Sequence, residues 1–349
     1  MALLSAIDGL LGRLDEWYFR YDCRRHRGRA PLFHRGWGSQ AAIDDVNAHW
    51  SAPRPSRTID IEWADGWAMS EPGVWVRNGG FATPAHAEHL PPESARAWLR
   101  FVRPSPQGSG PVAVLMPTSF EAGVQARMPL ARALARRGIS SVLLESPYMG
   151  RRKPAEQRGK MLSHFSDFFV LCSSSVEEGR AVLGWLAREG FDRLCTAGLS
   201  KGGYLATVTG LRSAVPADVV ALLAPHSGVP VLVDGLLGRL CDWELLQRTS
   251  GSDTPVRQRM VELFEPTSLE RLPPPAPPRR LTMICARQDR YVPRDSYERM
   301  ARRWQTQAIV RWLPGGHVSS IVERSHLIRA IEETFAGGPP DRLGHASLV

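Results

Sequence analysis

The sequence predicts an α/β protein with a mostly parallel central sheet flanked by helices. From residue 111 onward, short apolar runs alternate with longer segments of helical periodicity, as in successive βαβ units. Strands are expected at residues 112–116, 140–144, 193–197, 219–223, 281–286 and 308–313. Helices are expected at residues 124–137, 167–189, 202–212, 294–305 and 319–335. Before residue 111, alternating runs at 58–61 and 74–76 predict antiparallel strands.

The N-terminal residues predict an amphipathic helix followed by a basic stretch. Residues 2–19 carry apolar side chains at helical spacing, and residues 23–35 then contain five arginines, two histidines and no acid. We favour a helix packed on the core with a solvated basic loop after it. The alternative is an element that lies on an anionic membrane surface.

One long segment interrupts the alternation of expected strands and helices, and a short tail follows the last expected helix. Residues 225–275 are longer than a usual connection and contain helical patterns, so we interpret them as a helical lid over the carboxyl edge of the sheet. The chain is therefore divided into an N-terminal extension of residues 1–50, one domain of residues 51–337 that contains the lid, and a flexible tail of residues 338–349.

Composition excludes several classes of protein. The 349-residue chain has 43% hydrophobic and 23% charged residues, which is typical of a folded globular protein without a transmembrane helix. The net charge of +9 comes mostly from arginine, and no nucleic-acid-binding module accompanies it, so no nucleic-acid partner is expected. The five cysteines are isolated, which predicts a reduced, cytoplasmic protein without a disulfide or zinc site.

No cofactor and no metal ion are expected. Residues 36–41 have the spacing of a dinucleotide-binding loop, but no strand precedes them. His86 and His89 form an H-x-x-H pair in a proline-rich loop that lacks the other features of a metalloprotease.

The main functional signal is Gly198-Leu199-Ser200-Lys201-Gly202, which fits G-x-S-x-G. The motif stands between an expected strand and an expected helix, the context in which it presents a nucleophilic serine on a sharp turn. Glycines flank such a serine because side chains there would clash with the neighbouring strand and helix. Ser200 is therefore the expected nucleophile.

A serine hydroxyl needs a positioned base, and two later residues have the right order and placement. Asp289 follows the expected strand at 281–286, and His317 follows the expected strand at 308–313. Both lie at carboxyl ends of strands, where open α/β sheets bind ligands. His317 would take the proton from Ser200, and Asp289 would orient the imidazole.

An oxyanion hole needs two backbone N–H groups. Lys201, the residue after the nucleophile, is expected to supply one, and Thr118, Ser119 or Phe120 in the loop after the strand at 112–116 the other. The Lys201 side chain is expected to be solvated, the alternative being that it attracts an anionic group of the substrate.

With these motifs in place, the sequence resembles the α/β-hydrolase superfamily, and within it the alpha/beta-hydrolase domain-containing protein 18-like family. The resemblance is carried by residues 35–38, 138–148, 150–154, 185–190, 198–202, 289–294 and 315–317, among them Glu145-Ser146-Pro147-Tyr148 and Gly150-Arg151-Arg152-Lys153-Pro154. It implies an α/β-hydrolase fold and a serine hydrolase that acts on an acyl ester or phospholipid through Ser200, Asp289 and His317. Lys201, where a bulky apolar residue is expected, and Ser119-Phe120, in place of Gly-Asp, depart from the family pattern.

We therefore expect an esterase or lipase-like enzyme that forms an acyl-enzyme on Ser200. Its partner would be a small-molecule or lipid ester, with peripheral contact to an anionic membrane as a further expectation. The same residues would serve an acyltransferase, and a binding protein without catalysis is the alternative from another class. Sequence leaves the acyl chain, the head group and the oligomeric state open.

Overall fold

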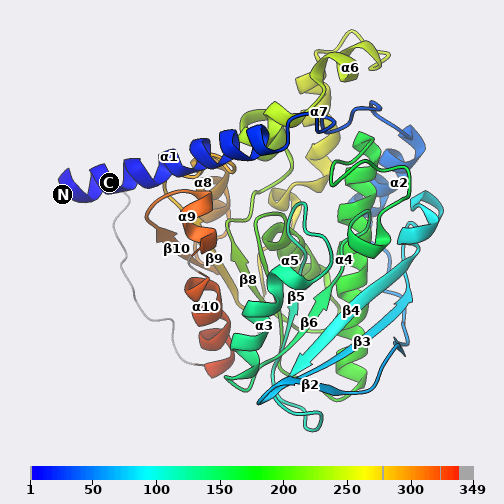
Figure 1. Cartoon of the computed structure of the whole chain (residues 1–349), viewed down its shortest axis with the longest axis vertical. Helices are drawn as coiled ribbons and strands as arrows, with labels where there is room; N and C mark the ends of the chain where they lie inside the picture. The colour runs from blue at the N-terminus through cyan, green and yellow to red at the C-terminus, as the bar shows by residue number, and fades with distance from the viewer. Residues whose placement is uncertain (1, 277–278, 323, 338–349) are drawn as a thin grey trace.

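The computed structural model describes residues 2–276, 279–322 and 324–337. Within these residues, ten strands form one sheet at the centre of the molecule (Figure 1). Nine of them follow the order β1-β3-β4-β6-β5-β7-β8-β9-β10, and β2 pairs with β3. The strands span β1 Glu62–Trp63, β2 Ala68–Glu71, β3 Val74–Ala82, β4 Arg96–Arg103, β5 Val112–Leu115, β6 Ser140–Leu144, β7 Leu194–Leu199, β8 Asp218–Leu222, β9 Leu281–Ala286 and β10 Ala308–Leu313.

The expected parallel sheet is confirmed. Strands β6, β5, β7, β8, β9 and β10 are parallel neighbours, and their bounds agree with the predicted ranges to within two residues. The strands β1 to β4 add an antiparallel extension, with β4 paired to β6. The mostly parallel central sheet that the sequence predicted is therefore present in the structure.

One expected strand is wrong. Residues 58–61 are not a strand, because the ladder with β3 begins only at Glu62, which pairs with Gly80. The carbonyl oxygen of Ile59 instead accepts a hydrogen bond from the side chain of Arg188 over 2.5 Å. The alternation of apolar and polar residues here reflects one-sided burial of an extended segment, since Ile59 is buried and Asp60 is exposed.

Helices cover both faces of the sheet (Figure 1). Helices α2, α4 and α5 pack against one another on one face, and α3 and α10 pack together on the other. The helices span α1 Ala2–Arg25, α2 Gln40–Ser51, α3 Met128–Ala135, α4 Phe165–Arg188, α5 Lys201–Arg212, α6 Trp243–Arg248, α7 Val256–Phe264, α8 Arg294–Arg303, α9 His317–Val322 and α10 Ser325–Ala336. The helix expected at 319–335 is thus two helices, α9 and α10.

Residues before position 51 contribute to the main core. Leu32, Phe33 and Ile43 belong to the same buried cluster as the strands of the sheet, and α2 packs against α4. Helix α1 lies along the edge of the molecule and its N-terminal end projects past the body (Figure 1). Among the described helices, none combines the length and apolar character that a membrane crossing requires.

Candidate active site

Ser200 stands in the turn between the end of β7 and the start of α5, as the motif predicts. Its backbone has φ +56° and ψ −122°, a strained conformation for a residue with a side chain. A Cβ atom on Gly198 would lie 2.2 Å from the carbonyl oxygen of Gly202, and one on Gly202 would lie 2.7 Å from that of Met116. Close backbone packing therefore requires both glycines of the motif.

His317 and Asp289 are in direct contact although 28 positions separate them. His317 Nδ1 lies 2.6 Å from Asp289 Oδ2, and both side chains are buried. Asp289 follows β9, and His317 begins α9 after the neighbouring parallel strand β10. Ser200 and His317 line the same cavity. The structure thus joins Asp289 to His317 and places Ser200 at the same cavity as His317.

Asp289 accepts hydrogen bonds from several directions. Its Oδ1 accepts the N–H groups of Tyr291 and Val292, each over 2.8 Å, and its Oδ2 accepts the Tyr297 hydroxyl over 2.6 Å in addition to His317. Burial alone would lower the pKa of His317. The negative charge of Asp289 stabilises the protonated imidazole by more than this, so the pKa of His317 is raised above its ordinary value. The imidazole is thereby oriented with Nδ1 towards Asp289, leaving Nε2 as the atom that can exchange a proton.

Two cavities adjoin Ser200. The first lies among α2, α4, α5 and the segment 225–275. Most side chains that line it are apolar, among them Val46, Trp50, Leu171, Tyr204, Leu232 and Phe264. We call it the apolar chamber. The second contains Ser200 and His317 and is bordered by Tyr18 from α1 and by Tyr291. An apolar cavity beside a nucleophile suits an apolar part of a substrate.

A third hollow adjoins the second and is bordered by the basic stretch that follows α1. It shares Tyr18, Ser119, Phe120 and Tyr291 with the cavity of Ser200 and His317. Its cationic side chains are Arg25, Arg27, Arg29, Arg158 and Lys160, with Asp22 beside them. Helix α1 is packed on the body of the molecule through the buried Phe19, whereas Arg24 and Arg25 are exposed.

The loop after β5 reaches Ser200, as the oxyanion expectation requires. Ser119 and Phe120 line both cavities that contain Ser200, and Phe120 has φ +58°. The third candidate, Thr118, donates its N–H to Glu121 Oε2 over 3.2 Å. Arg127 Nε lies 2.9 Å from each carboxylate oxygen of Glu121, so a buried ion pair fixes the loop.

The expectation that the Lys201 side chain is solvated is wrong. Only 8% of Lys201 is exposed, and the residue contributes to the lining of the apolar chamber. Its Nζ donates to Ser146 Oγ over 3.3 Å. Burial lowers its pKa to about 8, and the nearby Cys172 and Glu121 oppose that shift only in part.

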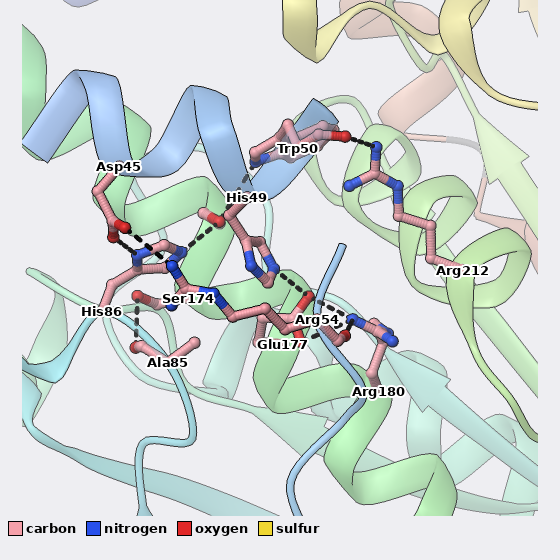
Figure 2. Close-up of polar contacts among 11 residues, drawn as sticks. Asp45, His49, Trp50, Arg54, Ala85, His86, Ser174, Glu177, Arg180 and Arg212 are labelled. Carbon is pink, nitrogen blue, oxygen red and sulfur yellow. Dashed lines mark hydrogen bonds and ion pairs between the residues drawn. The ribbon is translucent and has the colours of Figure 1, made fainter. Parts of the chain in front are cut away.

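A second polar network lies away from Ser200, between α2 and α4 (Figure 2). His86 bonds Asp45 Oδ2 through Nδ1 and Ser173 Oγ through Nε2, each over 2.8 Å, which resembles a serine–histidine–aspartate arrangement. Ser173 is 1% exposed in the middle of α4 and also accepts the indole N–H of Trp50 over 3.2 Å. We interpret this network as a buried structural one.

Both histidines of the H-x-x-H pair approach the same oxygen of Asp45, His86 Nδ1 at 2.8 Å and His89 Nε2 at 3.6 Å. His86 is engaged as described, whereas ligating atoms of His89, Glu88 and Asp45 lie within 4.8 Å of one another and form the one candidate cation group that the described residues offer. Arg54 Nη2 lies 3.2 Å from Asp45 Oδ1 and already partly neutralises the group. Absence of a resident metal ion stays a prediction.

Two buried residues at the site escaped the sequence analysis. Tyr297 bonds Asp289, and Asp15 of α1 accepts the backbone N–H of His317 over 2.9 Å. Asp15 lies four positions before Phe19 and three after Gly12, all three on the buried face of α1. The sequence signal that could have revealed Asp15 is an acidic residue on the apolar face of an amphipathic helix.

The sequence matches one protein-family model over most of its length. Residues 30–259 and 248–336 match the family described as alpha/beta hydrolase domain containing 18.

Known structures share the fold at low sequence identity. An acetyl xylan esterase from Paenibacillus sp. R4 has 14% identity and a TM-score of 0.57, with 86% of this chain and 96% of that chain covered. Acetyl xylan esterase 1 from Thermoanaerobacterium sp. has 13% identity and a TM-score of 0.56, with 89% and 98% covered. A cold-adapted esterase from an Arctic intertidal metagenomic library has 13% identity and a TM-score of 0.51, with 79% and 98% covered.

Proposed function

Because the chain belongs to the alpha/beta hydrolase domain containing 18 family, we propose that it is a serine hydrolase that cleaves carboxylic esters through Ser200, His317 and Asp289. The observation that carries this proposal is the 2.6 Å contact between His317 Nδ1 and Asp289 Oδ2, made beside a cavity that His317 shares with Ser200. The strained turn that presents Ser200 supports it.

The proposed reaction has two halves. Ser200 Oγ attacks the ester carbonyl while His317 Nε2 takes the hydroxyl proton, and the tetrahedral oxyanion is held by backbone N–H groups. The C–O bond to the leaving alcohol then breaks, and His317 returns the proton to that alcohol. Water repeats the sequence on the acyl-enzyme, releasing the carboxylic acid and regenerating Ser200. We assign the oxyanion donors to the N–H of Lys201 and to that of Ser119 or Phe120, because the N–H of Thr118 is engaged by Glu121.

The apolar chamber indicates where the acyl part of an ester or lipid ester binds. It adjoins Ser200 and is lined mostly by apolar side chains such as Val46, Trp50 and Phe264, with the buried Lys201 as a cationic residue among them. The segment 225–275, which supplies Leu232 and Phe264, would act as the lid of this chamber. Burial of an apolar chain there stabilises the complex by about 0.8 kcal/mol for each methylene group.

Peripheral contact with an anionic membrane is supported by the outer face of α1. Trp17 and Tyr21 stack on each other and are 62% and 46% exposed, and Arg24 and Arg25 follow in the last turn. Exposed aromatic rings beside arginines suit the boundary of an anionic bilayer. Sedimentation with vesicles that contain anionic lipid should weaken with salt and with Trp17→Ser, and unchanged binding by that variant would contradict the contact.

A fluorophosphonate probe tests the proposed nucleophile. The wild-type protein should bind one probe molecule, and Ser200→Ala should bind none. Ser173→Ala is the matched control, since Ser173 is hydrogen-bonded to His86 in the second network but is buried in α4. Labelling that survives Ser200→Ala, or that disappears in a folded Ser173→Ala protein, would overturn the assignment.

A further inference from the structure

One carboxylate of helix α1 is bonded to both loops that carry the Asp289–His317 pair. Asp15 Oδ2 accepts the N–H groups of Arg290 and His317, each over 2.9 Å, and Asp15 Oδ1 accepts that of Val318 over 2.8 Å. The residue is fully buried, with 0% exposed. Its three partners lie in two separate segments, since Arg290 is in the loop after β9 while His317 and Val318 are in the first turn of α9, and they are 275 to 303 positions from Asp15 in the chain.

The approach of Asp15 leaves no free space at the loop that precedes His317. A Cβ atom on Gly316 would lie 2.5 Å from Asp15 Oδ2. Small residues at this point are therefore needed for the carboxylate to reach the backbone. Contact between α1 and α9 extends beyond this one side chain, so the whole docked helix sets the position of Asp15.

Capping of α9 explains only part of this arrangement. The bonds to His317 and Val318 satisfy N–H groups that the first turn of a helix leaves without partners. The bond to Arg290 serves no helix end, yet it fixes the residue directly after Asp289. One buried carboxylate thus sets the positions of the loop of the acid and the loop of the base relative to each other.

We propose that Asp15 is a positioning residue that aligns His317 with Asp289, and that docking of α1 is thereby required for a competent active site. The inference rests on the proposed function, since it assigns Asp15 a role through His317. Burial of a carboxylate costs free energy that hydrogen bonds must offset. Here all the partners supplied are backbone groups of the active-site loops.

A purely structural role and a positioning role differ in their effect on His317. The charged or titratable groups around His317 are Asp289 with its hydrogen-bonded Tyr297, Asp15 and Tyr291. Tyr18, Arg127 and Arg324 also line the shared cavity. Asp15 and Asp289 both carry negative charge that raises the pKa of His317. Loss of the Asp15 charge should therefore lower that pKa and move the acid limb of kcat/KM to lower pH.

The experiment compares Asp15→Asn, Asp15→Glu and Glu16→Gln in the full chain with a p-nitrophenyl ester. We expect Asp15→Asn to lower kcat by about tenfold to a hundredfold with KM within about twofold, as a small misalignment does. Its acid limb should move to lower pH, and Asp15→Glu should recover part of the rate. Glu16→Gln is the control, because the partly exposed Glu16 of the same helix pairs with Arg20 and Arg239.

Two further measurements separate a positioning role of Asp15 from a purely structural one. Gly316→Ala retains every charge but displaces the Asp15 carboxylate, and it should lower kcat to a similar extent. An NMR titration of His317, assigned by its loss in His317→Gln, reports the pKa without any substrate. A folded Asp15→Asn protein with wild-type kcat and wild-type His317 titration would overturn the inference. Activity that survives Ser200→Ala would instead overturn the proposed function.

Discussion

Tyr297 and His317 donate hydrogen bonds to the same atom, Oδ2 of Asp289, and each of the two distances is 2.6 Å. Tyr297 is fully buried in α8 and packs edge-on against Trp312 of β10. The phenol therefore shares the negative charge of Asp289 with the imidazole. Its hydroxyl limits how strongly that charge favours protonation of His317.

Removal of the phenol hydroxyl should make His317 more basic. Tyr297→Phe retains the ring but leaves Asp289 with one donor fewer, so the attraction between Asp289 and the imidazolium grows. We expect the acid limb of kcat/KM to move to higher pH, opposite to the shift expected for Asp15→Asn. Comparison of the pH profiles of the two variants checks this, and a shift of both in the same direction would contradict it.

Replacement of the buried amine should change how stability depends on pH. The folded-state pKa of Lys201 is lowered to about 8 from 10.5, so folding disfavours its charged form. Between those values the unfolded chain binds more protons, and stability rises with pH by about 3 kcal/mol in total. Lys201→Met should lack this rise.

Urea unfolding of the wild-type protein and Lys201→Met at pH 7 and pH 10 measures the effect. The other titrating groups are common to both proteins, so the difference between their pH slopes isolates Lys201. The methionine variant should be the more stable one at pH 7, and equal slopes would show that the amine remains hydrated.

A larger side chain in the apolar chamber should shorten the acyl chain that the enzyme accepts. Val46 of α2 is 1% exposed and lines the chamber, so Val46→Phe reduces its space. We expect kcat/KM for a long-chain ester to fall at least about tenfold, while that for an acetyl ester stays within about threefold. Val261→Phe, at a 38% exposed position of α7, is the control. An equal loss for both esters would place the acyl chain elsewhere.

A lysine at position 152 would keep the positive charge of Arg152 but should not replace its guanidinium group. Arg152 is fully buried, with Nη2 and Nη1 at 2.6 and 2.9 Å from the two carboxylate oxygens of Glu178, and it also donates to the carbonyl oxygens of Glu145 and Ser94. Lysine lacks this planar set of donors. Arg152→Lys should therefore lower the free energy of unfolding by about 3 kcal/mol.

The adjacent Arg151→Lys is the matched control for that loss. The side chain of Arg151 is 54% exposed where it pairs with Glu145, so its replacement should cost less than about 1 kcal/mol. Chemical denaturation of both variants checks the contrast, and equal stability of the two would contradict the assigned role of Arg152.

The parallel strands and the loops at their carboxyl ends could be predicted because each depends on local patterns. Apolar runs predict β5 to β10, and the order of Ser200, Asp289 and His317 places them at one sheet edge. Helix α2 was missed, although Ser39 caps it and Ile43, Val46 and Trp50 follow at helical spacing. Its short pattern lies within residues 1–50, which the sequence analysis assigned to an N-terminal extension.

The contributions of Asp15, Tyr297 and Lys201 could not be predicted, because each depends on contacts between distant segments. An acid in an amphipathic helix gives no indication that backbone groups 275 positions away will satisfy it. A lysine after the nucleophile is ordinarily solvated, and only the packing of α4 and α5 shows that Lys201 is buried.

The most direct test of the central claim is to locate the acyl group during turnover. Rapid quenching with a p-nitrophenyl ester, followed by peptide mass spectrometry, should find up to one acyl group per chain on Ser200. A burst of p-nitrophenol of the same amplitude should accompany it, and Ser200→Ala should show neither. Hydrolysis that proceeds without an acylated Ser200, or an acyl group on another residue, would contradict the account.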